Sequence, residues 1–155
     1  AVYRPAQLAL LPERARPTPG AVALLAALRE RGMFVAAATN RSRFSAGPVL
    51  DAAGIAGFFD AVVTADDVAA PKPAPDMLAA ALERAGAAPG DAFFVGDMTV
   101  DLQAGRNAGV ETFIVLTGSC TADDFAPADR PALFPDLAAV GRVVAPPAGL
   151  PRAPR

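Results

Sequence analysis

Short apolar runs alternate with helix-like segments along this chain, and this alternation restricts the folds that it can adopt. The apolar runs cover residues 33–38, 61–64, 92–95 and 112–116. Each has the length of a buried strand, and the segments between them have the apolar periodicity of helices that end at glycines. Alternating strands and helices form a parallel, doubly wound sheet with helices on both faces. We therefore predict an α/β fold, a three-layer Rossmann-like parallel sheet. The predicted helices cover residues 19–31, 45–53, 76–85 and 100–107.

The composition limits the chemistry that is open to this chain. It has 155 residues, no His and a single Cys, Cys120. Without His, no Ser–His–Asp or Cys–His site can form, so catalysis must rest on carboxylates, Lys, hydroxyls and a hard metal ion. A net charge of −2 without a basic cluster argues against a nucleic-acid or membrane partner. The lone Cys, and the absence of a signal peptide or membrane-length apolar run, lead us to expect a cytoplasmic protein.

The stretch VGDMTVD places two carboxylates where a strand gives way to a helix. Asp97 follows the apolar run 92–95, and Asp101 lies four residues further on. If the helix starts near Thr99, both carboxylates lie at its N-terminus, and crowded carboxylates are costly to keep charged unless a cation neutralises them. Mg²⁺ suits this place, because it binds one or two carboxylates together with waters and a phosphate. The alternative is an Asp helix cap followed by a solvated Asp.

Lys72, Thr39 and Asn40 are further candidates for the same site. Of the 14 basic residues, only Lys72 is a lysine, which indicates a position that needs a compact point charge. It lies in the proline-rich loop APKPAPD, ahead of helix 76–85. Thr39 and Asn40 directly follow the run 33–38, at the strand ends where such sheets bind ligands. Taken singly, a surface Lys and a turn Asn are the simpler interpretations, but together with the Asp pair they indicate one site.

In this order, the motifs resemble the haloacid dehalogenase (HAD) superfamily of phosphohydrolases. The resemblance runs from about Arg16 to Val144 and is closest to phosphoglycolate-phosphatase-like members. It rests on PTPGAVALLAALRERGMFVAAATN, PKPAPD and VGDMTVDLQAGRNAGV. It implies a HAD-like core over residues 17–145 and a Mg²⁺-dependent phosphohydrolase that acts on a small phosphorylated metabolite.

The resemblance also implies a role for each candidate residue. Thr39 would hydrogen-bond the transferring phosphoryl group together with the backbone at Asn40. Lys72 would offset the negative charge of the nucleophile and the phosphate. Asp97 would bind Mg²⁺, and Asp101 would hold the metal or its waters.

One family motif is missing from the chain. These enzymes open with a central strand that ends in DxD and supplies the Asp nucleophile, but the first 50 residues here contain no Asp. Either the chain is truncated and has lost that strand and the cap, or residues Gln7–Leu11 replace the strand without its acids. Residues 1–16 are thus a cap remnant or a substitute strand. The Pro-rich residues 146–155 are expected to be a disordered tail.

Because this strand is missing, several ways of completing the sheet and two functions are compatible with the sequence. Gln7–Leu11 could fill the gap, a second copy could donate the segment in a homodimer, or the flanking strands could close on each other. As this chain, lacking its nucleophile, the phosphohydrolase would be nearly inactive. The alternative is a non-enzymatic HAD-like domain that binds phosphate and Mg²⁺ or serves assembly. Other phosphate-related classes fit less well, because a receiver domain has its acids first, and the GxGxxG and P-loop motifs are absent.

Overall fold

The computed structural model describes residues 15–146 of the chain. Our predictions for Gln7–Leu11, for the cap remnant ahead of residue 15 and for the tail beyond residue 146 lie outside the described residues. The elements of secondary structure run from Ala21 to Val144, within the predicted core of residues 17–145.

The amphipathic segments form helices close to their predicted bounds. These are α3 (Ala21–Glu30), α4 (Arg43–Ala52), α5 (Asp76–Ala85) and α6 (Thr99–Ala108). Gly86 and Gly109 end α5 and α6 with φ of 64° and 69°, a left-handed backbone that glycine adopts without a steric penalty. Helix α7 (Leu137–Val144) was not predicted, and it begins where the Asp136 carboxylate accepts the N–H of Ala139. Short 3₁₀ turns lie at Ala56–Phe58, Ala65–Asp67, Pro89–Asp91, Ala122–Asp124 and Pro127–Ala132.

All the strands of the described chain pair in parallel, as predicted. They are β1 (Ala36–Thr39), β2 (Ala61–Thr64), β3 (Phe93–Gly96), β4 (Glu111–Val115) and β5 (Leu133–Phe134). Strand β1 begins three residues later than predicted, because Val35 is instead held by Asp60. The N–H of Val35 donates to the Asp60 carboxylate, and its carbonyl accepts the N–H of Asp60, both at 2.8 Å.

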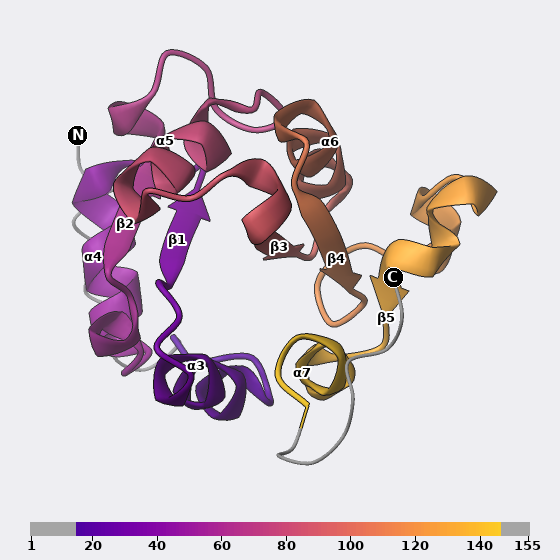
Figure 1. The fold of residues 1–155 in the computed structure, drawn as a ribbon, viewed down its shortest axis with the longest axis horizontal. Helices are drawn as coiled ribbons and strands as arrows, with labels where there is room; N and C mark the ends of the chain where they lie inside the picture. The colour runs from indigo at the N-terminus through magenta and orange to yellow at the C-terminus, as the bar shows by residue number, and fades with distance from the viewer. Residues whose placement is uncertain (1–14, 147–155) are drawn as a thin grey trace.

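Within residues 15–146 the strands form two separate sheets, β1–β2 and β3–β4–β5. Figure 1 shows the two groups on either side of the molecule, with β1 and β3 facing the middle. The two strands that flank the missing position therefore do not close on each other, so that one of our three alternatives is wrong.

Helices on both faces hold the two sheets together. On one face, α5 contacts β1, β2 and α6, and α6 contacts β3 and β4. On the other face, α7 packs against β4, β5 and α3, and Figure 1 shows α3 and α7 side by side. Strand β4 is buried between them, because Phe113 and Val115 join the core beside α7 while Ile114 joins the core beside α6. No helix among the described residues is long and apolar enough to cross a membrane.

Candidate active site

Lys72 connects the ends of the two sheets. Its ammonium Nζ donates to the carbonyl of Ala38, near the end of β1, at 2.9 Å. The same Nζ lies 2.7 Å from Oδ1 of Asp101, on the first turn of α6 after β3. The carboxyl ends of β1 and β3 thus meet at one rim, where ligands of parallel α/β sheets bind. From the sequence we expect Thr39, Lys72 and the Asp pair at one site, and the contacts of Lys72 join it to Asp101 of that set.

The Asp101 carboxylate organises the start of α6. Its Oδ2 accepts the N–H groups of Asp97 at 3.1 Å and Met98 at 3.0 Å, while Oδ1 faces Lys72. Only 4% of Asp101 is exposed. A Cβ on Gly96 would lie 2.3 Å from the Asp101 Cβ, so this close approach requires glycine at position 96. The simpler interpretation, in which Asp101 is a solvated residue after an Asp cap, is therefore wrong.

The Lys72 side chain is enclosed by groups that stabilise a positive charge. It is 10% exposed, and besides Asp101 and the Ala38 carbonyl it has the Phe94 ring, whose centroid lies 5.3 Å from Nζ. The negative face of an aromatic ring attracts a cation at this distance. Breaking a buried ion pair by removing one partner is costly, because the other charge is left uncompensated. Lys72 is therefore a fixed positive charge at the rim.

Two asparagine side chains hold the backbone of the loop that carries Lys72. Asn40 donates to the Lys72 carbonyl at 2.9 Å and accepts the Lys72 N–H at 3.0 Å. Asn107, on α6, donates to the carbonyl of Pro73 at 2.9 Å. From the sequence, Asn40 is expected at the site for its backbone, whereas Asn107 is not singled out. One signal was available, because these two are the only asparagines in the chain.

Asp97 lies at the same rim with an exposed side chain. None of the hydrogen bonds or ion pairs found in residues 15–146 uses its carboxylate, whereas both oxygens of Asp101 are engaged. Gly118, in the loop after β4, packs directly on Asp97, since a Cβ at 118 would lie 2.2 Å from Asp97 Oδ2. Gly118 is a site residue that the sequence analysis missed.

The donor set fits Mg²⁺ only in its hydrated form. Across residues 15–146, no three Asp, Glu, Cys or His side chains gather into a cluster that could hold a metal ion. A single available carboxylate is nevertheless compatible with Mg²⁺, because this ion keeps several waters and takes further oxygens from a bound phosphate. Of the two Asp carboxylates at this rim, Asp97 is the one that could bind Mg²⁺ directly.

Comparison with known proteins assigns the chain to a family. The family model described as haloacid dehalogenase-like hydrolase matches residues 1–109. This chain belongs to the HAD-like hydrolases. The family that the motifs around Thr39, Lys72 and Asp97 resemble is thereby confirmed.

Curated relatives carry phosphatase names. A probable phosphatase, IndB of Dickeya dadantii, is 40% identical over 111 residues, which are 72% of this chain and 48% of the relative. The phosphoglycolate phosphatase of Agrobacterium fabrum is 33% identical over 146 residues, 87% of this chain and 62% of the relative. This HAD-like chain therefore spans about half the length of the curated relatives that it matches.

Solved structures agree with the α/β fold. CbbY from Rhodobacter sphaeroides, solved in complex with phosphate, aligns with a TM-score of 0.77 at 28% identity, covering 86% of this chain and 60% of CbbY. A HAD-superfamily hydrolase of Geobacter sulfurreducens aligns with a TM-score of 0.61 at 34% identity, covering 68% and 53% of the two chains. The predicted Rossmann-like HAD fold is confirmed.

Proposed function

We propose that this chain carries the phosphate- and Mg²⁺-binding rim of a HAD-type phosphohydrolase for a small phosphorylated metabolite. The observation that carries the proposal is the enclosed Lys72–Asp101 pair at the carboxyl ends of β1 and β3. It fixes a positive charge against Asp101, whose carboxylate also accepts the N–H of Asp97, so that an anion and a cation could bind at the same rim. The phosphatase names of the relatives support this class of reaction.

Each residue has a distinct task in this proposal. Lys72 attracts the phosphoryl oxygens, and the Thr39 hydroxyl and the backbone at Asn40 orient them. The Thr39 hydroxyl already accepts the N–H of Arg41 at 3.2 Å, which leaves its own proton to donate. Asp97 would be the direct ligand of Mg²⁺. Asp101, whose oxygens already contact Lys72 and two backbone N–H groups, would hold only waters of the ion. When bound, Mg²⁺ supplies positive charge that neutralises the phosphate.

Calorimetric titration of the 155-residue chain with inorganic phosphate, with and without Mg²⁺, tests this proposal. We expect Lys72→Gln to weaken phosphate binding at least about tenfold, since a hydrogen bond to a charged group contributes roughly 1.5–3 kcal/mol. Asp97→Asn should remove the effect of Mg²⁺ while leaving some phosphate binding. Arg142→Gln, which removes one exposed charge on α7, is the control. Equal phosphate binding by the Lys72 variant, the control and the unmodified chain would refute the site.

A second candidate function is a non-enzymatic phosphate-binding or assembly domain. It is favoured by the split sheet, since no strand among residues 15–146 lies between β1 and β3 to present a nucleophile at the rim. Turnover of p-nitrophenyl phosphate separates the two candidates. Mg²⁺-dependent hydrolysis that EDTA abolishes supports the enzyme, and binding without turnover supports the second function.

A further inference from the structure

Arg41 is an exposed cation at the same rim, and hydrogen bonds on both sides hold its backbone in place. Its N–H donates to the hydroxyl of Thr39, at the end of β1, at 3.2 Å. Its carbonyl accepts the N–H of Ala65, just after the end of β2, at 3.1 Å. The preceding residue, Asn40, is hydrogen-bonded to the backbone of Lys72. Arg41 is therefore fixed next to the Lys72 loop, over the ends of β1 and β2.

The two carboxylates in the turn after β2 are engaged by groups other than the Arg41 side chain. Asp66 accepts the backbone N–H of Arg43 at 2.8 Å. Asp67 pairs with the Arg43 guanidinium at 2.5 Å, and Arg84 lies 3.8 Å from the same carboxylate oxygen. Among the described residues, no hydrogen bond or ion pair uses the guanidinium of Arg41. Its positive charge is therefore available to a ligand.

Arg41 and Lys72 differ in the anionic group that each would bind. The charge of Lys72 is shared with Asp101, which lies 2.7 Å from its Nζ, whereas Arg41 has no counter-charge in the described part of the chain. An ammonium is a compact point charge, but a guanidinium presents parallel N–H donors that match the two oxygens of a carboxylate or a phosphoryl group. Two anionic groups could therefore bind at neighbouring positions of the rim.

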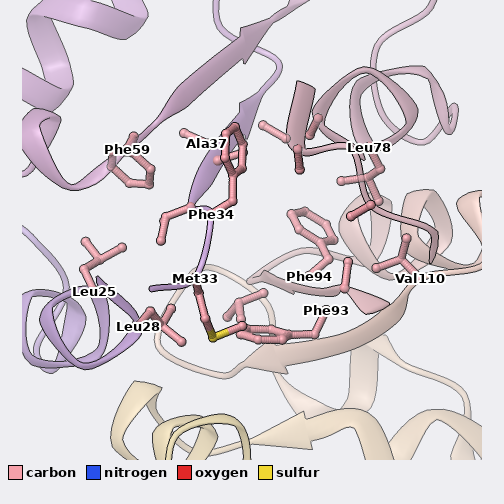
Figure 2. Close-up of a pocket in the computed structure, with 18 of the residues that line it drawn as sticks. Leu25, Leu28, Met33, Phe34, Ala37, Phe59, Leu78, Phe93, Phe94 and Val110 are labelled. Atoms are coloured by element: carbon pink, nitrogen blue, oxygen red, sulfur yellow. The ribbon is translucent and has the colours of Figure 1, made fainter. Parts of the chain in front are cut away.

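An apolar groove below the rim restricts where a second anionic group can lie. The groove has a volume of about 650 Å³ and is lined by β1 and β3 ahead of their carboxyl ends. Figure 2 shows apolar side chains there, including the rings of Phe34 and Phe94. Asp91 is the only charged residue among the described residues that line it, so burying an anion in the groove would be costly. A second anionic group therefore stays on the rim, where Arg41 lies.

We propose that Arg41 determines substrate specificity by binding a second anionic group of the substrate, either a carboxylate or a second phosphoryl group. The substrate class is then a small phosphate ester that carries two anionic groups. Lys72 and Thr39 hold the phosphoryl group that is transferred, and Arg41 holds the other group toward β2. This inference rests on the proposed function, because it requires a phosphoryl group bound at Lys72.

Calorimetric titration with phosphonates tests the role of Arg41, because their P–C bond is not hydrolysed during the measurement. Phosphonoacetate carries a carboxylate, methylenediphosphonate carries a second phosphoryl group, and ethylphosphonate carries neither. Mg²⁺ is omitted so that chelation by the ligands does not contribute. We expect phosphonoacetate or methylenediphosphonate to bind about five- to tenfold more tightly than ethylphosphonate, because charge-assisted bidentate hydrogen bonds are strong. The ligand that shows this preference identifies the second group.

Variants of Arg41 assign the preference to its side chain. Arg41→Gln should abolish the preference but leave ethylphosphonate binding within about twofold of the unmodified chain, since an exposed charge that makes no direct contact contributes little. Arg41→Lys should keep part of the preference, because the charge remains without the planar guanidinium. Arg142→Gln, which removes an exposed charge on α7, is the control and should keep the full preference.

The results that overturn this inference differ from those that overturn the proposed function. Equal affinity of the unmodified chain for the three ligands, or an unchanged preference in Arg41→Gln, shows that Arg41 binds no second group. An equal loss of affinity for all three ligands in Arg41→Gln shows that Arg41 binds the phosphoryl group itself, which also overturns the inference. Ethylphosphonate binding that is absent, or that Lys72→Gln does not weaken, refutes the proposed phosphate site and this inference with it.

Discussion

At the level of single residues, the position of Lys72 depends on two side chains that hydrogen-bond the backbone of its loop and would not themselves touch a phosphate. Asn40 and Asn107 fix the Lys72 loop from β1 and from α6. Helix α6 therefore acts on Lys72 twice, through Asp101 at its ammonium and through Asn107 at the next residue's carbonyl. Removing Asn107 should therefore change the position of Lys72 without removing a side chain that would touch phosphate or Mg²⁺.

We predict that Asn107→Ala loosens the Lys72 loop but not the helix, because alanine has a higher helix propensity than asparagine. Loss of one hydrogen bond corresponds to roughly 0.5–1.5 kcal/mol, so phosphate binding should weaken about two- to tenfold. NMR with lysine-selective isotope labelling would show whether the Lys72 side chain begins to move among several conformations. Glu83→Ala, at an exposed position of α5, is the control, because Gln103 on α6 donates a hydrogen bond to Asn107 itself. An unchanged Lys72 signal in Asn107→Ala would contradict the prediction.

We predict that Gly118→Ala weakens Mg²⁺ binding but leaves the stability of the fold almost unchanged. The new Cβ would lie 2.2 Å from Asp97 Oδ2 and 2.9 Å from Asp97 Cβ, so the exposed carboxylate must move. Because an exposed side chain moves easily, the free energy of unfolding should change by less than about 1 kcal/mol. The effect of Mg²⁺ on phosphate binding should fall as far as in Asp97→Asn. Chemical unfolding measures the free energy of unfolding, and calorimetry measures the effect of Mg²⁺ on phosphate binding. An unchanged Mg²⁺ effect in Gly118→Ala would show that Gly118 does not belong to the site.

At the level of elements, glycines in helix interiors have opposite roles in α4 and α6. Gly105 lies against β4, where a Cβ would come within 1.8 Å of Thr112 Oγ1, whereas nothing lies within 4 Å of a Cβ at Gly47 in α4. We predict that Gly105→Ala destabilises the chain by about 1–3 kcal/mol through overpacking. Gly47→Ala should change the free energy of unfolding by less than about 1 kcal/mol, because its gain in helix propensity is opposed by Pro48, which disfavours helical backbone at a non-glycine residue before it. Urea unfolding of both variants checks this, and similar changes in the two would refute the close packing of α6 on β4.

The turn after β2 should make stability depend on pH. Asp67 accepts the Thr64 hydroxyl at 2.5 Å and the Thr64 N–H at 2.8 Å, and it pairs with Arg43 at 2.5 Å. These groups lower the pKa of Asp67, the Thr64 hydroxyl bond first, then the Thr64 N–H and the Arg43 charge. A lowered folded-state pKa stabilises the fold above the unfolded value of about 3.9, and this stabilisation is lost as pH falls through the folded pKa.

We therefore predict that Asp67→Asn destabilises the chain at about pH 6 and that this difference shrinks toward about pH 2.5. Asp60 and Asp124 also have lowered pKa values, but they are present in both proteins and cancel in the comparison. Urea unfolding of both proteins at the two pH values gives the difference. A difference that stays constant with pH would contradict the assignment to Asp67.

The elements that the sequence predicted correctly are those with local signals. Helix α5 ends at Gly86 as predicted, and β2 has its predicted bounds. Helix α7 and β5 were missed, because β5 has only two residues and its pairing with β4 is not visible in the sequence. Thr39, Lys72 and the Asp pair could be found from composition and order. Asn107 and Gly118 could not, because their contacts join residues that lie far apart in the chain.

At the level of the whole molecule, the split sheet bears on activity. The rim described here offers Lys72 and Asp97, but residues 15–146 contain no strand between β1 and β3 to bring a carboxylate to it. We predict that the 155-residue chain hydrolyses phosphate esters far more slowly than the phosphoglycolate phosphatases that it resembles, because water must replace a positioned nucleophile. Side-by-side assays with p-nitrophenyl phosphate measure this. Rapid Mg²⁺-dependent turnover that Asp97→Asn abolishes would show that another residue of the chain is the nucleophile.

The two-part sheet also bears on the order in which the chain folds. Residues 36–64 contain β1, α4 and β2, and residues 93–115 contain β3, α6 and β4, so each half closes over a short stretch of chain. Short-range contacts form early because closing a short loop costs less entropy. The halves would therefore form before they dock, with their junction absent from the folding transition state. Because Lys72 joins Ala38 of one half to Asp101 of the other, a folding intermediate with both halves intact would still lack the proposed phosphate site.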